Sequence, residues 1–225
     1  MAAAPLSPHR QLADVPVQDC GDPLVDIRAE GGLLYGPPPE CPATAPDYCW
    51  VRRQVYERLL RVQQELPAGL RLRLYEGLRS LPIQQQLFDE EKARVAHDQP
   101  ELTPQQVHER AALLVAPPVH WDGRPNVPPH STGAAVDVEL VDPSGEVIDF
   151  GMEAKDWVRV PAEFCETRHA ALPAAAQANR LLLAQAMEAQ GFANYVREWW
   201  HYSYGDRYWA LRTGQPQAIF GPVAR

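Results

Sequence analysis

Four residues in two distant segments constrain this chain more than any other feature. The segment Pro-Pro-His130-Ser-Thr-Gly-Ala-Ala-Val-Asp137 carries a histidine and an aspartate, and Arg-Glu198-Trp-Trp-His201-Tyr carries a glutamate and a second histidine. Two histidines and one carboxylate commonly hold a catalytic zinc ion whose fourth position stays open. A glutamate three residues before a ligating histidine is suited to accept a proton from water at that position. The pattern predicts a fold that brings both segments to one Zn²⁺.

The same segments resemble a known enzyme family. His-x6-Asp followed by Glu-Trp-Trp-His is similar to the zinc D-alanyl-D-alanine dipeptidases, the VanX-like branch of the D,D-peptidases. The stretch Tyr75-Glu76-Gly77-Leu78-Arg79 resembles the Asp-Gly-Tyr-Arg stretch that carries the family's catalytic arginine. The run from Asn179-Arg180 through Met187 to Gly191-Phe192 resembles the helix that precedes the zinc-binding Glu-x-x-His. The resemblance therefore extends over nearly the whole chain.

The resemblance implies a role for each of these residues. His130, Asp137 and His201 would hold one Zn²⁺ per chain. Glu198 would accept a proton from water and pass it to the leaving amine, and Arg79 would stabilise the oxyanion that forms on the carbonyl. The implied reaction is hydrolysis of D-Ala-D-Ala or a closely similar small dipeptide, in the metabolism of peptidoglycan precursors or in wall recycling.

Residues that recognise the substrate are also expected. In the VanX-like enzymes a Phe-Asp pair after a Met-Gly turn helps to hold the substrate ammonium. Asp156 is the nearest counterpart here, one residue off in spacing and preceded by Lys155, and Glu153 is the alternative acid. This departure puts strict D-Ala-D-Ala selectivity in doubt. Ser131, next to His130, is expected to contact the substrate or a metal ligand.

Other interpretations are open at this point. Glu-Trp-Trp-His is also compatible with a core strand, Asp137 with a turn or cap, and Arg79 with a surface arginine paired to Glu76 or Asp89. Related functions are a D,D- or L,D-carboxypeptidase acting on wall peptides and an inactive zinc-containing module that binds peptides. The remaining histidines are expected to be surface or hydrogen-bonded residues: His9, His97, His108, His120 and His169.

Composition is compatible with a single enzyme domain, which we expect over residues 24–225 after an extended arm over residues 1–23. The chain has 225 residues, 45% of them hydrophobic, and its 23 prolines indicate many ordered turns. A net charge of -8 argues against nucleic acid as a partner. We expect no membrane span and no signal peptide, and hence a cytoplasmic protein, with a periplasmic or exported mature form as the alternative. The sequence leaves a homo-oligomer open.

The four cysteines, Cys20, Cys41, Cys49 and Cys165, have neither zinc-finger spacing nor the density of a disulfide framework. In a reducing compartment they are expected to be free thiols, whereas export would allow Cys41 and Cys49 to close a small loop.

Periodicity predicts helices over 51–66, from Pro82 to about residue 97, and from Thr103-Pro104, with strands over 70–75 and 134–140. Glu198 and His201 would point to opposite faces of a regular strand. Both can face one metal ion only if the strand is irregular at Trp199-Trp200. From the resemblance we expect an α+β domain: a small, mainly antiparallel sheet flanked by helices, with the zinc cleft on the sheet.

Overall fold

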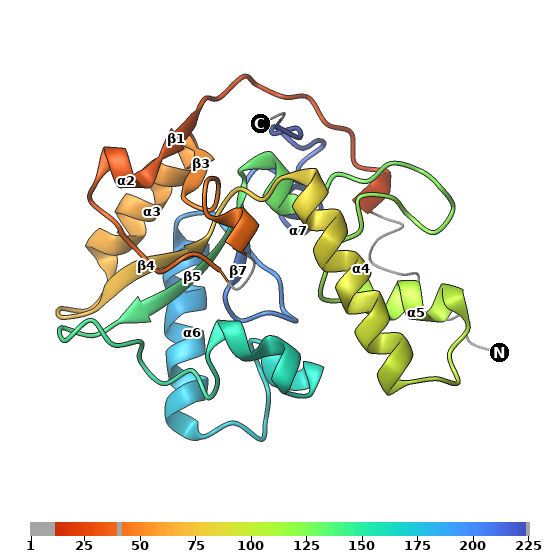
Figure 1. The fold of residues 1–225 in the computed structure, drawn as a ribbon. Coiled ribbons are helices and arrows are strands. Elements are labelled where there is room, and N and C mark those ends of the chain that lie inside the picture. The colour runs from red at the N-terminus through yellow and green to blue at the C-terminus, as the bar shows by residue number, and fades with distance from the viewer. Residues whose placement is uncertain (1–11, 40–41, 224–225) are drawn as a thin grey trace.

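A five-stranded sheet forms the centre of the computed structural model, which describes residues 12–39 and 42–223 (Figure 1). Its strand order is β2-β4-β5-β7-β6. The strands are β2 (Leu34–Tyr35), β4 (Arg71–Glu76), β5 (Ala135–Val141), β7 (His201–Ser203) and β6 (Ala193–Asn194). The pair β2–β4 is parallel and the other three pairs are antiparallel. The predicted α+β fold with a mainly antiparallel sheet is therefore confirmed.

Strand β5 lies in the middle of this sheet and is buried on both faces. Val136, Val138 and Leu140 belong to the main hydrophobic core, as their alternation predicts. Asp137 and Glu139 occupy the alternate positions and are buried as well. The Glu139 carboxylate pairs with Arg73 of β4 at 2.7 Å. The second face of β5 is thus a buried polar surface rather than a solvated one.

Helices α3 (Arg53–Glu65) and α6 (Ala174–Ala189) contact each other and lie behind the sheet in Figure 1. Their apolar faces contribute to the main core. Helix α3 begins two residues after the predicted start because Val51 lies in a separate two-stranded sheet. That sheet pairs β1 (Leu24–Asp26) with β3 (Trp50–Arg52). Two further helices are short: α2 (Ile27–Glu30) and α7 (Arg207–Arg212).

Helices α4 (Leu81–Asp98) and α5 (Pro104–Ala111) pack together on one side of the sheet, at the right of Figure 1. They enclose a second, smaller hydrophobic cluster of Phe88, Val95, Ala111, Ala112 and Val115. Both helices match the predicted segments, and Thr103 caps α5 in a capping box with Gln106. The α4–α5 pair therefore has its own small core.

The described part of the N-terminal segment runs beside the C-terminal segment. Gln18 and Cys20 donate backbone hydrogen bonds to the carbonyls of Ala218 and Ile219, both at 2.9 Å. The predicted arm spans residues 1–23, of which residues 1–11 lie outside the described part of the chain.

Cys20, Cys49 and Cys165 are free thiols, and Cys41 lies outside the described residues. Within residues 12–39 and 42–223, no helix combines the length and the apolar character needed to cross a membrane.

Candidate active site

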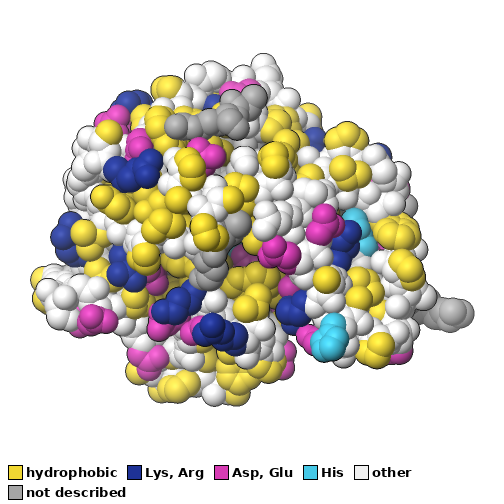
Figure 2. Space-filling view, viewed as in Figure 1, with side chains coloured by type: hydrophobic (Ala, Val, Ile, Leu, Met, Phe, Trp, Pro, Cys, Tyr) yellow, Lys and Arg dark blue, Asp and Glu magenta, His cyan; other side chains and the backbone are white. Residues whose placement is uncertain are grey.

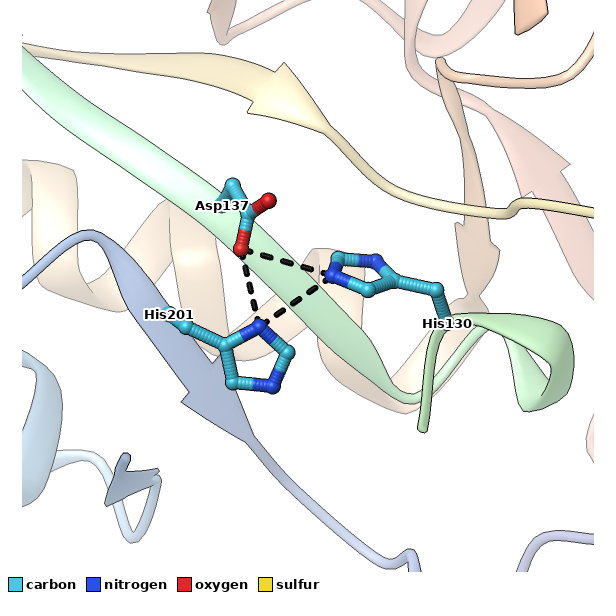
Figure 3. Close-up of side chains that lie close together, drawn as sticks. All are labelled: His130, Asp137 and His201. Atoms are coloured by element: carbon cyan, nitrogen blue, oxygen red, sulfur yellow. Dashed lines mark hydrogen bonds and ion pairs between the residues drawn. The ribbon is translucent and has the colours of Figure 1, made fainter. Parts of the chain in front are cut away.

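Three predicted ligands converge at the sheet. The Asp137 Oδ1 atom lies 2.9 Å from His201 Nδ1 and 3.4 Å from His130 Nε2, and the two ring nitrogens are 3.1 Å apart. Figure 3 shows the three side chains pointing toward one another from β5, from β7 and from the turn before β5. All three residues are buried. Among the described residues, this is the one group of three or more such side chains close enough to hold a metal ion.

The donor atoms have the spacing that zinc requires. Tetrahedral Zn²⁺ with bonds of about 2.0–2.1 Å separates neighbouring ligand atoms by about 3.3 Å, close to the distances here. His130 Nδ1 lies 2.7 Å from the carbonyl oxygen of Gly77, which can only accept, so this nitrogen carries the proton. In the neutral ring Nε2 is then the unprotonated nitrogen, and it faces the metal position. Burial by itself would raise the pKa of Asp137, yet His130 and His201 hold it well below its ordinary value, so the ligand is ionised.

Local structure brings His130 and Asp137 together. His130 lies in a 3₁₀ turn (Pro129–Thr132) that Gly133 ends with a φ of 67°, a left-handed conformation that favours glycine. The chain then enters β5 directly, and β5 pairs Asp137 with His201 of β7. The predicted turn at Gly133 is confirmed. The two residues are seven apart in the sequence, and both can reach one metal position because a turn and the start of a strand lie between them.

A turn places Glu198 beside His201. The His201 amide donates to the Glu198 carbonyl oxygen at 3.2 Å, which closes a four-residue turn around Trp199 and Trp200 before β7 begins. The predicted irregularity is confirmed as this turn. Asn194 stabilises it, because its Nδ2 donates to the carbonyl oxygens of Glu198 at 3.2 Å and His201 at 3.1 Å. Glu198 and His201 can consequently face one metal position.

The Glu198 carboxylate has the environment of a general base. Its Oε2 lies 3.8 Å from His201 Nδ1, and the residue is only 7% exposed. Burial raises the pKa of Glu198 well above its ordinary value; the negative charge of Asp137 adds to the shift, and Arg79 opposes it. A carboxyl group with a raised pKa is better matched to accepting and returning a proton near neutral pH.

Arg79 reaches the same site and is also ion-paired. Its guanidinium makes a two-point contact with the Glu76 carboxylate, in which Nε donates to Oε1 at 3.0 Å, and its Nη1 donates to Gln84 Oε1 at 3.1 Å. The alternative in which Arg79 pairs with Glu76 is thus observed, but the pair is buried rather than at the surface. Burial would lower the pKa of Arg79, yet Glu76 raises it, so the side chain stays charged.

Gly77 makes the approach of Arg79 to the metal segment feasible. A Cβ atom at this position would lie 2.7 Å from the carbonyl oxygen of Trp50, so a side chain does not fit there. The Gly77 amide donates to the Tyr48 carbonyl oxygen at 2.6 Å, and the Arg79 amide donates to the His130 carbonyl oxygen at 3.2 Å. The segment after β4 is therefore bonded to the segment that carries the first ligand.

A cavity of about 500 Å³ is lined by the three predicted metal ligands, Glu198 and Arg79. In the space-filling view the surface is hollowed between the sheet and the α4–α5 pair, with hydrophobic and acidic side chains beside the hollow (Figure 2). Two parts of its lining come from different segments of the chain. The sheet wall is His130, Asp137, Tyr195, Glu198 and His201, and the helix wall is Gln84 and Leu87 of α4 with Leu113, Val115 and Ala116 of the segment that follows α5.

The three substrate-binding candidates lie elsewhere. Asp156 accepts from Arg159 at 2.9 Å, and Glu153 pairs with Lys155 at 2.5 Å. Neither acid lines the cavity, although Lys155 and Trp157 do. The buried Ser131 hydroxyl donates to the Pro128 carbonyl oxygen at 2.7 Å and also lies outside the lining. The structure therefore brings the three predicted metal ligands, Glu198 and Arg79 together but not Asp156, Glu153 or Ser131.

Three further residues at the site are absent from the sequence prediction. Tyr195 and Gln84 line the cavity, and Asn194 supports the Glu198–His201 turn. Gln84 has a detectable signal, because it shares one face of α4 with Phe88 and Val95 and so occupies a predictably buried position. Tyr195 has none, since its hydroxyl bonds to Leu113, which is 82 residues away, and Asn194 bonds within the turn itself, where no recognised motif marks it.

Comparisons with known proteins agree with this geometry. A family model described as D-ala-D-ala dipeptidase (Peptidase_M15) matches residues 49–218. A D-alanyl-D-alanine dipeptidase of Synechocystis sp. is 32% identical over 233 aligned residues, covering 94% of this chain and 92% of the relative. A protein of the same description from Escherichia coli is 38% identical over 73 residues, covering 32% of this chain and 36% of the relative.

Solved structures overlap more loosely. An LD-carboxypeptidase, LdcB, has a TM-score of 0.45 at 16% identity, with 89% of this chain and 76% of that chain covered. VanYB in complex with D-alanine-D-alanine has a TM-score of 0.43 at 17% identity, with 76% and 80% covered. Family membership rests on the sequence matches: the chain belongs to the D-Ala-D-Ala dipeptidase family and is a zinc metallopeptidase.

Proposed function

We propose that this peptidase hydrolyses D-Ala-D-Ala or a closely similar dipeptide, with His130, Asp137 and His201 as the zinc ligands. The observation that carries the proposal is the convergence of three ligand atoms within 3.4 Å of one another, with the Glu198 carboxylate 3.8 Å from one of them. The same cavity contains Arg79. An arrangement for binding alone would need neither the glutamate nor the arginine.

The residues divide the chemistry between them. A zinc ion held by three protein ligands lowers the pKa of a bound water and polarises a carbonyl oxygen. Glu198 accepts the proton of the attacking water and delivers it to the nitrogen of the breaking amide bond, so that the products are two amino acids. Arg79 donates hydrogen bonds to the carbonyl oxygen as negative charge develops on it.

A panel of dipeptides tests this function. Zinc-loaded protein is expected to cleave D-Ala-D-Ala faster than L-Ala-D-Ala or L-Ala-L-Ala, with release of free alanine as the measurement. Glu198→Gln is the matched control, since it keeps the size of the side chain and removes the proton acceptor. Absence of D,D-dipeptide cleavage by zinc-loaded protein would contradict the proposal.

A carboxypeptidase acting on longer wall peptides is the second candidate. Two observations favour it: the cavity of about 500 Å³ is much larger than a dipeptide of two alanines requires, and neither Asp156 nor Glu153 lines it. A dipeptidase needs a group that pairs with the free ammonium and so excludes longer chains. Efficient cleavage of N-acetyl-D-Ala-D-Ala would favour the carboxypeptidase, whereas strong preference for the free dipeptide would favour the dipeptidase.

A further inference from the structure

Gln84 is a buried amide on the inner face of α4. It is 2% exposed and belongs to the same buried stripe as Phe88 and Val95. A polar side chain in such a position is costly unless both ends of its amide find partners. The partners of Gln84 therefore indicate why a glutamine lies there.

Both ends of the Gln84 amide are bonded, and each bond leads to the cavity. Its Oε1 accepts from Arg79 Nη1 at 3.1 Å, and its Nε2 donates to the carbonyl oxygen of Ala116 at 2.8 Å. Arg79 and Ala116 both line the cavity. Because a guanidinium can only donate and a carbonyl can only accept, the orientation of the amide is fixed. Gln84 thus connects Arg79 to the helix wall.

The contacts of Arg79 leave a defined set of donors. A guanidinium has five N–H groups. Glu76 takes one from Nε and one from Nη2, and Gln84 takes one from Nη1. One N–H on each terminal nitrogen remains, and these are the donors available to a ligand in the cavity. The Glu76 contact alone would leave Nη1 without any protein partner among the described residues.

We propose that Gln84 is a positioning residue for the reaction, which fixes the Arg79 guanidinium so that its two remaining donors meet the substrate carbonyl. The proposal rests on the proposed role of Arg79. Gln84 itself acts through Arg79 and through the Ala116 carbonyl, and it exchanges no proton with the substrate. Loss of the amide would let the guanidinium rotate about its contact with Glu76, and small displacements of a catalytic group lower turnover strongly.

A double-mutant cycle on zinc-loaded protein tests this role. Gln84→Met, which is similar in size and lacks the amide, is expected to lower kcat for D-Ala-D-Ala by about 10- to 100-fold with a smaller change in KM. In an Arg79→Ala background the same replacement is expected to change kcat by less than about twofold, because the group that it positions is absent. Gln85→Met, one residue further and outside the cavity lining, is the matched control.

The outcomes separate this proposal from the proposed function. Equal effects of Gln84→Met with and without Arg79 would overturn the positioning role while leaving the role of Arg79 intact. Wild-type turnover in Arg79→Ala would overturn both. Loss of bound zinc from Gln84→Met would assign the residue a purely structural role and also overturn the proposal. If Gln84→Met does not fold, as judged by its thermal unfolding, Gln84→Asn enters the same cycle, since its shorter amide cannot span Arg79 and Ala116.

Discussion

The two walls of the cavity are built in different ways. The sheet wall has its chemistry fixed by backbone structure: β5 and β7 pair Asp137 with His201, and a turn sets Glu198 beside them. The helix wall is supported by a separate small core and joins the site through side chains, namely Gln84 to Arg79 and Tyr195 to the Leu113 carbonyl. Trp157 packs against both hydrophobic cores. This difference predicts which substitutions abolish chemistry and which only weaken it.

The largest effect is expected from removing a ligand on the sheet wall. His130→Ala, Asp137→Ala or His201→Ala should reduce bound zinc from about one per chain to near none and abolish hydrolysis, since two ligands hold zinc poorly. Zinc content by elemental analysis and release of D-alanine are the measurements. His97→Ala, an exposed histidine on α4, should keep both. Full zinc occupancy in all three ligand variants would contradict the assignment. In the wild type, chelation should abolish activity and added Zn²⁺ should restore it.

A loss of chemistry without loss of metal is expected next. Glu198→Gln retains the three ligands but cannot accept a proton, so kcat should fall by about 10²-fold or more while zinc content stays unchanged. Steady-state kinetics together with metal analysis of the same preparation separates the two properties. Turnover at the wild-type rate would show that another group accepts the proton.

The next largest loss of turnover is expected from Arg79→Ala, because this replacement removes the guanidinium that lies between the sheet wall and the helix wall. Loss of an oxyanion donor costs about 2.7–4 kcal/mol, or about 10²- to 10³-fold in kcat. The same replacement leaves the buried Glu76 carboxylate without its cation, so thermal unfolding should be measured beside the kinetics. A change confined to stability, with kcat unaltered, would make Arg79 a structural partner of Glu76.

The sheet wall could be predicted from the sequence more fully than the helix wall. His130, Asp137, Glu198 and His201 form short motifs, and the irregularity before His201 follows from strand alternation alone. Helices α3, α4 and α5 and strands β4 and β5 were also predictable, because apolar periodicity and helix starts such as Thr103-Pro104 are local signals.

The helix wall depends on contacts between distant segments. Tyr195 bonds to Leu113, which is 82 residues away, and Gln84 to Ala116, which is 32 residues away. No local pattern specifies which glutamine or tyrosine makes such a bond. For the same reason, the sequence could not show that Asp156 and Glu153, its candidates for substrate binding, pair with neighbouring residues outside the cavity.

A smaller effect is expected from Tyr195→Phe. The Tyr195 hydroxyl donates to the Leu113 carbonyl oxygen at 2.7 Å and so bonds the sheet wall directly to the helix wall. A hydrogen bond of this kind contributes about 0.5–1.5 kcal/mol, so KM should rise by about two- to tenfold while zinc content is unchanged. Tyr56→Phe removes a similar bond, to the Gly31 carbonyl oxygen outside the cavity lining, and should leave KM unaltered. A KM change of equal size in both variants would refute the bridging role.

The smallest effect is expected at Asp156, which sharpens the comparison because sequence and structure predict different results there. As the ammonium-binding acid it would raise KM strongly when replaced, whereas its carboxylate pairs with the exposed Arg159 and lies outside the cavity lining. Because the carboxylate lies outside the cavity, Asp156→Asn should change KM for free dipeptides by less than about twofold, and loss of the exposed pair should cost only about 0.2–1 kcal/mol of stability. Comparison of KM for D-Ala-D-Ala and its N-acetyl form decides the matter. A large rise confined to the free dipeptide would mean that Asp156 reaches the substrate ammonium after a rearrangement of residues 153–159.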